Sequence, residues 1–432
     1  MNIAFDIDGV LTDFEWFLDT YGKKYFRKKT KREVQTVKPS SSVSERFGFS
    51  KEWDKKFYTR YLFWYARKYP IRENAAETIR TLRLQGHKVY FITARALADG
   101  EGVLGHTMRV CLEKWLKDNR VEYDGIYYVP LEECAYYKAK WCKKLKIDVF
   151  IEDEPTNIKQ LEKLCRVICV SADYNQEITE CVQAIDFGEI YWNIINDKRK
   201  AFKPLEYKER DELNPAEKTE YYERLKNYYS KLPFDKVSLV LRKKNIEKSI
   251  QRVGAPIRWM AGMEKMETKI SVPCDGVIFV CNHRRAWDVP ICYCALNEIK
   301  ARILTKREFE DSVLGSWMKS LGIIFLNRED KKSGKAAQNL MIQSVLHGEN
   351  VLLYPEGTRN KTSEPLLPFK MGAVYMAQVT QAPIIPLVIY KKDKKYRIVV
   401  GEKMMVKVSD DLEMQNSILH QKMEKMLLDV GK

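Results

Sequence analysis

Residues 1–13 read MNIAFDIDGVLTD, and this stretch decides the fold of the first half of the chain. A strand-like run comes first, then Asp6 and Asp8 lie two positions apart, and Gly9 permits a tight turn. Residues i and i+2 of a strand point to the same side, so the two carboxylates converge. Such a pair can hold Mg²⁺, or one member can attack phosphorus while the other transfers protons. Taken alone, the motif is equally compatible with an acidic turn that only ends a strand.

Strand-like and helix-like segments alternate around this motif. The expected strands are Asn2–Phe5, Lys88–Thr93, Ile147–Ile151 and Arg166–Val170, and helical patterns over Ala75–Gln85 and Tyr136–Leu145 lie between them. This alternation predicts an α/β domain with a Rossmann-like parallel sheet and helices on both faces. An aromatic, charged insert at about residues 14–70 is too long for a simple crossover, so we expect it to form a small helical cap.

Further polar residues lie where the later strands are expected to end. Thr93 falls within FITAR, Glu152 and Asp153 fall within IEDEP, and Lys138 lies on the helical segment before that strand. Groups at the carboxyl ends of successive strands meet in the crevice where α/β sheets bind ligands. The pattern therefore predicts a single site that contains these residues and the first two aspartates.

These motifs, together with DYN at 173–175 and a closing FGEIYWNI helix, resemble the haloacid dehalogenase-like phosphatases, closest to their 5′-nucleotidase-like branch. The resemblance covers about residues 1–195. It implies that Asp6 is the nucleophile that becomes an aspartyl-phosphate. It also implies that Asp8 protonates the leaving oxygen and then activates water, and that both aspartates bind Mg²⁺.

The same resemblance assigns the remaining residues of this site. Thr93 and Lys138 are expected to hold the phosphate, with Lys140 as the alternative lysine two residues away. Asp153 is expected to help bind Mg²⁺, and Glu152 to support the ligands from behind. A decayed regulatory domain that has lost its activity is the alternative to a working phosphatase.

The second half of the chain contains the stretch CNHRRAWD at 281–288, directly after the apolar run GVIFV. A neutral imidazole can take a proton from an alcohol when a carboxylate fixes its tautomer. Asp288 lies five residues beyond His283, a little more than one helical turn. It can therefore fold back toward the imidazole if a helix starts there. A surface histidine beside two arginines is the alternative.

Three further stretches favour the catalytic interpretation. They are LGIIFLNRED at 321–330, VLLYPEGTRN at 351–360 and APIIPLVI at 382–389. With NHRRAWD, their order and spacing resemble the four sequence blocks of the glycerolipid acyltransferases, specifically the 1-acylglycerol-3-phosphate acyltransferase family. The resemblance covers about residues 236–420 and implies a second α/β domain.

The acyltransferase resemblance implies a reaction and its residues. His283 would deprotonate the free hydroxyl of lysophosphatidic acid, and Asp288 would orient it. The oxygen would then attack an acyl thioester carried on coenzyme A or acyl carrier protein, which yields phosphatidic acid. Contacts with the glycerol phosphate are expected from Arg328, Glu356, Gly357 and Arg359, with Lys306 ranked lower.

Arg285 and Cys281, which lie on either side of His283, bear on substrate preference and on the possibility of a covalent intermediate. The family usually has serine where this chain has Arg285, so an altered headgroup or donor preference is expected. Cys281 is the only candidate for a covalent nucleophile in the block, and its strand position predicts burial instead. A covalent acyl-enzyme is therefore not implied.

The composition places limits on the partners and the compartment. With 432 residues, a net charge of +16 and ordinary hydrophobic content, the chain suits two folded domains and an anionic partner. No apolar run is long enough for a membrane span, no signal peptide is visible, and the cysteines lack disulfide spacing. We expect a cytoplasmic protein with a phosphatase domain at 1–196, a charged linker with one helix at 197–235 and an acyltransferase domain at 236–432.

The segment Lys236–Met260 is a candidate membrane contact. It contains seven basic residues against one acid, with Ile246, Ile250 and Val253 at helical spacing and Trp259 near its end. A basic amphipathic surface with a tryptophan anchor suits an anionic leaflet, here the inner face of the membrane. An ordinary packing helix is the alternative, and no nucleic-acid-binding motif is present.

The sequence therefore predicts a bifunctional, peripherally membrane-associated enzyme with an acyltransferase and a Mg²⁺-dependent phosphomonoesterase. The phosphatase substrate is left open between a lipid-pathway phosphate and a nucleotide. The alternatives are an acyltransferase with a vestigial or regulatory first domain, and a soluble nucleotidase fused to an acyltransferase of other acceptor specificity.

Overall fold

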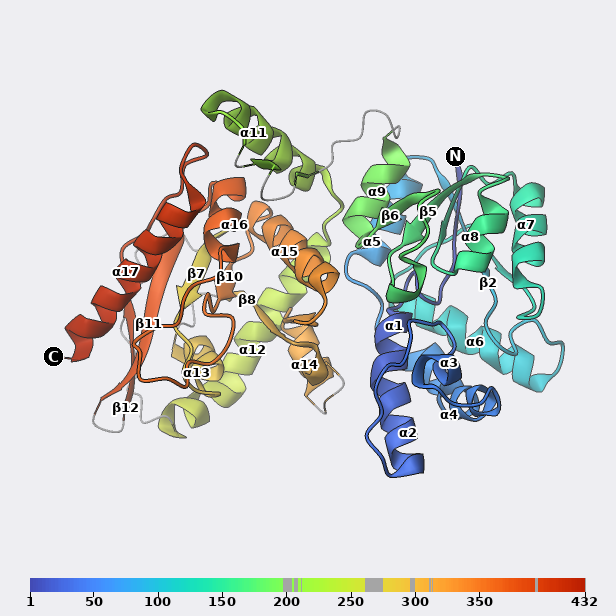
Figure 1. Ribbon diagram of the computed structural model, residues 1–432, viewed down its shortest axis with the longest axis horizontal. Helices are drawn as coiled ribbons and strands as arrows, with labels where there is room; N and C mark the ends of the chain where they lie inside the picture. Colours follow the sequence, from blue (N-terminus) through green and yellow to red (C-terminus); the bar gives the residue numbers. More distant parts are fainter. Residues whose placement is uncertain are drawn as a thin grey trace. The chain divides into compact units, whose positions relative to one another are not determined.

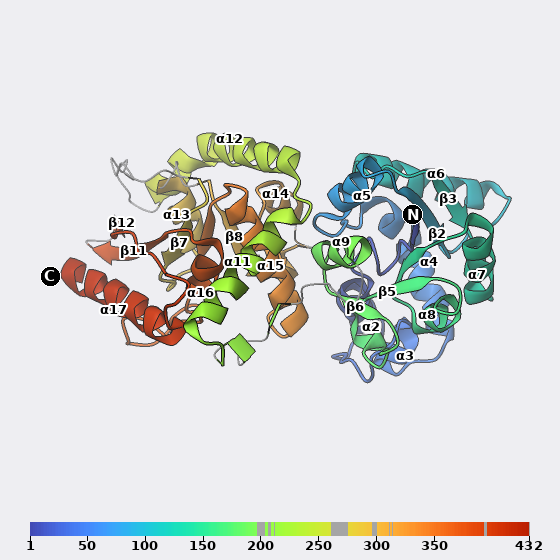
Figure 2. The same cartoon turned by 90° about the horizontal axis from the view of Figure 1, so that it is seen from above.

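The computed structural model describes residues 1–196, 204–205, 209–210, 212–260, 275–295, 300–310, 312, 314–392 and 395–431. The chain divides into two compact units, Met1–Ala201 and Phe202–Lys432. Each unit is built around a six-stranded sheet with helices packed on it (Figures 1 and 2). The α/β class expected for both halves of the chain is confirmed.

The sheet of the first unit is entirely parallel and has the order β3-β2-β1-β4-β5-β6. Its strands are β1 (Asn2–Phe5), β2 (Lys88–Thr93), β3 (Gly125–Tyr128), β4 (Val149–Glu152), β5 (Arg166–Val170) and β6 (Val182–Ala184). Phe5 at the end of β1 pairs with Phe91 of β2 and Ile151 of β4. Residues that follow these three strands therefore reach the same edge of the sheet.

Helices cover both faces of this sheet. Successive side chains of β1 point to opposite faces, so neighbouring residues of this strand pack on different helices. Ala4 belongs to a buried cluster that includes Cys142 of α7 and Ile158 of α8, whereas Phe5 stacks on Phe187 of α9 at 6.4 Å between ring centroids. The helices are α5 (Ala75–Leu84), α6 (Val103–Asp118), α7 (Cys134–Leu145), α8 (Pro155–Leu161) and α9 (Phe187–Ile195), with a short 3₁₀ turn η2 (Asp173–Asn175).

The predicted cap is present and helical. It consists of α1 (Phe14–Phe17), the π-helical turn η1 (Leu18–Gly22), α2 (Lys23–Thr30), α3 (Val43–Phe47) and α4 (Glu52–Lys68). These helices share a core of aromatic rings, in which the ring centroids of Phe17 and Tyr65 lie 4.4 Å apart. The aromatic content of the insert therefore provides the cap with a hydrophobic core of its own.

The sheet of the second unit has the order β12-β11-β7-β10-β8-β9. Its strands are β7 (Ile278–Cys281), β8 (Arg302–Lys306), β9 (Ile324–Leu326), β10 (Val351–Leu353), β11 (Ile384–Lys392) and β12 (Lys395–Val400). All neighbours are parallel except β11 and β12. Directly after β7, the buried Asn282 exchanges two hydrogen bonds with the backbone of Ile389, which fixes the start of the next loop against β11.

Seven α-helices of the second unit lie wholly within the described residues, with a 3₁₀ turn η3 (Arg307–Phe309) after β8. The helices are α11 (Pro215–Lys231), α12 (Lys236–Met260), α13 (Asp288–Ala295), α14 (Gly315–Ser320), α15 (Lys331–Leu346), α16 (Gly372–Thr380) and α17 (Leu412–Gly431). Among the described segments, we find no helix both long and apolar enough to cross a membrane.

Helix α11 corrects one expectation about the segment 197–235. The helix starts where predicted, because Asn214 caps it in a reciprocal pair with Glu217 and Pro215 occupies the first turn. However, four of its tyrosines are buried, and the helix packs on α15 and α16. This part of the segment is therefore packed against the second unit instead of being a solvated linker. Residues 197–203, 206–208 and 211 lie outside the described part of the chain.

Two candidate active sites

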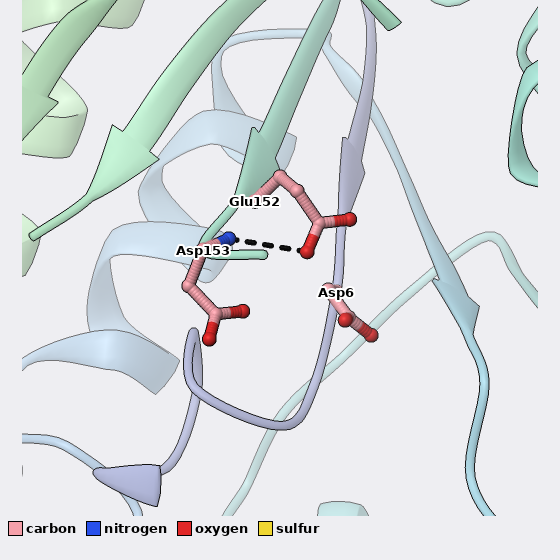
Figure 3. Close-up of side chains that lie close together, drawn as sticks. All are labelled: Asp6, Glu152 and Asp153. Carbon is pink, nitrogen blue, oxygen red and sulfur yellow. Dashed lines mark hydrogen bonds between the residues drawn. The ribbon is translucent and has the colours of Figure 1, made fainter. Parts of the chain in front are cut away.

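The first candidate site lies at the carboxyl edge of the first sheet. Asp6 follows β1, Thr93 ends β2, and Glu152 and Asp153 lie at the end of β4. Figure 3 shows that the side chains of Asp6, Glu152 and Asp153 lie close together, and one carboxylate oxygen from each lies within 4.8 Å of the other two. The predicted meeting of residues from separate strand ends is thus present in the structure.

This carboxylate cluster has the chemistry of a Mg²⁺ site. All three carboxylates are buried, and hard cations prefer oxygen ligands of this kind. Gly9, at φ +79°, lets the loop after β1 pass directly beside the cluster, since a Cβ there would lie 1.9 Å from Asp153 Oδ2. The residues present therefore fit a divalent cation, and Glu152 belongs to the cluster itself.

Lys138 of α7 lies fully buried between two of these carboxylates. Its Nζ donates to Asp6 Oδ2 and to Glu152 Oε2, both at 2.7 Å. Burial alone would lower the pKa of Lys138, but Asp6 and Glu152 outweigh it and hold that pKa well above its usual range. Lys140 is exposed, so Lys138 is the lysine that the fold places at the site.

Two residues at the end of β2 complete the site. The Thr93 hydroxyl is buried and has no hydrogen-bond partner among the described residues, as expected for a group that awaits a ligand. Arg95 was not anticipated from the sequence, yet it is buried and donates from Nη2 to Asp8 Oδ1. Burial raises the pKa of Asp8, whereas Arg95 lowers it. Asp8 is therefore paired with Arg95, apart from the carboxylate cluster.

The DYN motif supports the cluster from the next strand. The Tyr174 hydroxyl donates to Asp153 Oδ2, and Asn175 Nδ2 donates to the Asp153 carbonyl at 2.7 Å. Asp173 accepts two hydrogen bonds from the cap residue Arg46, which is itself only 1% exposed and also binds Asp19. The motif thus links the cap to a candidate metal ligand through consecutive residues.

The second candidate site begins where β7 ends. His283 Nδ1 lies 3.1 Å from Asp288 Oδ2, and the same oxygen accepts from the backbone N–H groups of Arg284 and Arg285 at 2.7 and 2.6 Å. A carboxylate accepts hydrogen bonds, so Nδ1 is the ring nitrogen placed to donate, and a neutral imidazole in this arrangement has its lone pair on Nε2. Asp288 also begins α13, as expected from the spacing of the pair. The histidine is therefore held in the tautomer of a general base.

Glu356 holds the histidine loop from the neighbouring strand. One of its oxygens accepts from the His283 backbone N–H at 2.8 Å and the other accepts from Leu367 N–H at 2.9 Å. The ring centroids of Tyr354 and the His283 imidazole lie 4.6 Å apart. Both Glu356 oxygens bind backbone groups, so this buried side chain is placed to fix the loop. Its expected contact with the substrate stays a prediction.

The cationic residues expected at this site lie at neighbouring strand ends. Arg328 follows β9, Arg359 follows β10 and Lys306 ends β8; all three are exposed. Within the described residues, neither arginine forms an ion pair with a carboxylate. Gly357 adopts φ +67° and approaches the Lys370 side chain closely, where a Cβ would lie 2.7 Å from Cε. Three exposed cations therefore lie at the ends of three adjacent strands, β10, β8 and β9, and β10 is the strand next to β7.

Two remaining expectations concern the residues around His283. The Arg285 guanidinium lies 5.8 Å from the Tyr396 ring centroid, over β12, while its backbone N–H completes the turn. Arginine is therefore accepted at the position where serine was expected without loss of the turn. Cys281 is fully buried, and burial raises the pKa of its thiol well above the usual range, so it is not a nucleophile candidate.

Helix α12 corrects part of the expected membrane face. Ile246 and Ile250 are buried against Leu321 and Ile323, so they pack on protein and cannot face a bilayer. Arg242 is also buried, in a two-bond ion pair with Glu349. The exposed residues of this helix include the basic Lys236, Lys244, Lys248 and Arg252 and the apolar Val237, Val240, Leu241, Val253, Trp259 and Met260.

Family models match both halves of the chain. Residues 1–200 match the model described as 5′ nucleotidase, deoxy (pyrimidine), cytosolic type C protein, and residues 262–390 match the model described as acyltransferase.

Curated relatives match each half separately. A putative nucleotidase from Bacillus cereus is 28% identical over 183 residues, which cover 41% of this chain and 90% of that protein. A 1-acyl-sn-glycerol-3-phosphate acyltransferase from Bacillus subtilis is 29% identical over 154 residues, which cover 33% of this chain and 74% of that protein. One of these relatives is thus a nucleotidase and the other an acyltransferase, in agreement with the two family models.

Two solved structures are similar to parts of the chain. The 1-acyl-sn-glycerophosphate acyltransferase from Thermotoga maritima is 19% identical, with a TM-score of 0.38, and the match covers 49% of this chain and 89% of that chain. A predicted phosphoglycolate phosphatase from Haemophilus somnus is 16% identical, with a TM-score of 0.32, and the match covers 44% of this chain and 95% of that chain.

Proposed function

Because the chain joins a haloacid dehalogenase-like 5′-nucleotidase domain to an acyltransferase domain, we propose that it is a bifunctional enzyme that acylates lysophosphatidic acid and hydrolyses a phosphomonoester. The observation that carries the acyltransferase half is the hydrogen bond between His283 Nδ1 and Asp288, at 3.1 Å. The observation that carries the phosphatase half is the cluster of Asp6, Glu152 and Asp153 beside Lys138.

In the acyl transfer, His283 Nε2 takes the proton of the free hydroxyl of lysophosphatidic acid. The oxygen attacks the carbonyl carbon of the acyl thioester, and the tetrahedral intermediate then expels the thiolate. The imidazolium returns its proton to the sulfur, so the products are phosphatidic acid and a free thiol. Asp288 keeps the imidazole oriented and stabilises its positive charge during the transfer. The thiol carrier is coenzyme A or acyl carrier protein.

The acceptor phosphate is bound by the exposed cations of the neighbouring loops. Arg328 and Arg359 offer planar guanidinium groups that can donate two parallel hydrogen bonds to phosphate. Glu356 holds the backbone of His283, and Gly357 lets its loop approach Lys370. These contacts support an acceptor that carries its phosphate near the reacting hydroxyl.

In the phosphatase, Asp6 attacks phosphorus and forms an aspartyl-phosphate. Asp8 donates a proton to the departing alcohol and then takes one from the water that releases the phosphate. Thr93 donates its unpaired hydroxyl to the phosphoryl group, and Lys138 offsets negative charge on Asp6. Asp6 and Asp153 would hold Mg²⁺ together with Glu152 of the same cluster, whereas the Asp8 carboxylate, which Arg95 binds, stays only a predicted ligand. The ion supplies electrostatic stabilisation of the phosphoryl oxygens when it is bound.

Two substrate classes are supported for the phosphatase. The names of the relatives that match the first unit support a nucleotide, whereas the fusion to an acyltransferase supports a phosphate of the same lipid pathway. Phosphate release from a nucleotide panel, lysophosphatidic acid and phosphatidic acid separates them. Release from nucleotides alone would reject the pathway link.

The acceptor is a lipid, so the second unit must meet a bilayer. The exposed apolar residues of α12, including Trp259, and the exposed basic residues on the same helix support peripheral contact with an anionic leaflet. We place the enzyme at the cytoplasmic face of the membrane for this reason.

A pair of variants tests the two activities together. His283→Ala should abolish acyl transfer and spare phosphatase activity, and Asp6→Asn should do the reverse, because each residue belongs to a separate unit. Labelled acyl donors and a phosphomonoester panel provide the two assays. A scaffold with two vestigial sites predicts no change in either variant, and loss of both activities in one folded variant would refute independent sites.

A further inference from the structure

Arg95, in the loop after β2, has bonding capacity that the proposed chemistry does not use. The residue is 3% exposed, yet only Nη2 has a partner, the Asp8 carboxylate. Nε and Nη1 are buried and have no hydrogen-bond partner within the described ranges. Buried charged donors without an acceptor destabilise a fold, so these two N–H groups are expected to meet acceptors from outside the chain.

The position of Arg95 indicates which part of a substrate it would meet. Its guanidinium lies between Asp8 and the cap, with the Tyr65 ring of α4 5.0 Å from Cζ. The Tyr65 hydroxyl is fixed by Thr12 at 2.6 Å, so the ring is held in place. In an in-line displacement the alcohol leaves on the side opposite the nucleophile, where its proton donor must lie. Groups paired with Asp8 therefore lie beside the alcohol, whereas Lys138 lies at Asp6.

We infer that Arg95 recognises a second acidic group on the alcohol part of the phosphomonoester. This inference rests on the proposed phosphatase activity. A guanidinium donates its strongest hydrogen bonds to carboxylate and phosphate oxygens, and its charge selects them over neutral acceptors. A carboxylate and a second phosphate share this chemistry, so substrates of either kind would fill the two unpaired N–H groups. Arg95 is thus a specificity-determining residue, and Thr93 serves the phosphoryl group common to all substrates.

Matched substrate pairs test the inference. Glycerol 3-phosphate and 3-phosphoglycerate differ by one carboxylate, and adenosine 5′-monophosphate and adenosine 3′,5′-bisphosphate differ by one phosphate. The wild-type enzyme should favour the acidic member of at least one pair by about tenfold or more in kcat/KM. The pair that shows the preference identifies the acidic group.

Arg95→Gln should remove this preference. The change also removes the ion pair with Asp8, so kcat should fall for both substrates of a pair. The decisive quantity is therefore the ratio of their kcat/KM values. That ratio should fall to near one in Arg95→Gln and recover in part in Arg95→Lys, which restores the charge. Arg80→Gln removes an exposed arginine on α5 and should leave the ratio unchanged. An equal loss for both members, or no wild-type preference in either pair, would overturn the inference.

A binding measurement separates this inference from the phosphatase proposal. Calorimetric titration of Asp6→Asn with the same four compounds requires no turnover. Tighter binding of an acidic member that is lost in Asp6→Asn/Arg95→Gln supports Arg95 even if the wild-type enzyme hydrolyses none of them. Equal binding of the acidic and neutral members, with phosphate release intact, refutes the role of Arg95 and leaves the phosphatase standing.

Discussion

At the scale of single residues, both sites rely on buried charges that are compensated by specific partners. Lys138 balances two carboxylates, and Asp288 Oδ2 accepts three hydrogen bonds in one turn. Glu15 is different, because the hydrogen bond from Asp173 N–H at 2.8 Å and the charge of Arg46 compensate its charge only in part. Burial first, then Asp173 and Asp13, raise the pKa of Glu15 to about 7.

This shift predicts a pH-dependent effect of Glu15→Gln. A carboxyl group whose pKa is raised by folding weakens the fold as pH rises from its ordinary value to the raised one, here from 4.5 to about 7. Glutamine cannot ionise, so the variant should gain about 3 kcal/mol in the free energy of unfolding at pH 8 and almost nothing at pH 4. Denaturant unfolding at both pH values measures this. The exposed Glu162→Gln is the control, and an equal gain at both pH values would contradict the prediction.

Glu356 gives a second prediction at this scale. Glu356→Ala removes the acceptor for the His283 backbone N–H and displaces the base, so acyl transfer should fall about 100-fold in kcat. Glu356→Gln keeps one acceptor oxygen and should lose less. Steady-state kinetics with lysophosphatidic acid distinguishes positioning from binding.

The outcome depends on which kinetic constant changes. Glu364→Ala, an exposed glutamate in the same loop region, should behave like the wild type. A rise in KM for lysophosphatidic acid with unchanged kcat would instead show that Glu356 contacts the acceptor directly.

At the scale of elements, the helices and strands that could be predicted are those with a clear pattern within their own stretch of sequence. The apolar strands β1, β2 and β5 were predicted to the residue, and the cap was recognised from the length and aromatic content of its insert. The pairing of Arg95 with Asp8 was not predictable, because spacing does not report which distant side chains meet. The face of α12 was misjudged for a related reason: helical periodicity cannot tell whether apolar residues pack on protein or on lipid.

The corrected face of α12 makes a specific prediction about membranes. Val240→Asp/Trp259→Ser replaces two exposed apolar residues and should weaken binding to vesicles with anionic lipid by about tenfold, because apolar burial supplements charge attraction. Co-sedimentation with anionic and zwitterionic vesicles measures the effect. Leu84→Asp alters an exposed leucine of α5 in the first unit and serves as the matched control. Equal binding of both variants would show that α12 does not meet the bilayer.

At the scale of the whole molecule, the two units carry separate cores and separate sites. The second unit has its own buried ion network, in which Arg242 donates two hydrogen bonds to Glu349 and Arg302 lies beside the same carboxylate. Loss of Arg242 would leave the buried Glu349 carboxylate with only the longer contact to Arg302, at 3.9 Å. The stability of each unit can therefore be perturbed by itself.

Calorimetry of the full chain tests this independence. Arg242→Met should destabilise the second unit by about 3–5 kcal/mol and lower only one of two unfolding transitions. Lys138→Met should lower only the other, since its carboxylate partners belong to the first unit. A single transition that both variants lower together would show that the units unfold cooperatively.

The turn at His283 has a consequence for how this gene can change. Asp288 is tied to two backbone N–H groups, and Glu356 to a third, so the loop keeps most of its hydrogen bonds without an imidazole. A single codon change at 283 should therefore silence the proposed acyl transfer yet preserve the fold of the loop. A change at 288 would destroy the loop together with the chemistry. Inherited loss of activity is therefore expected to start at the histidine, and a descendant of this kind would keep the aspartate.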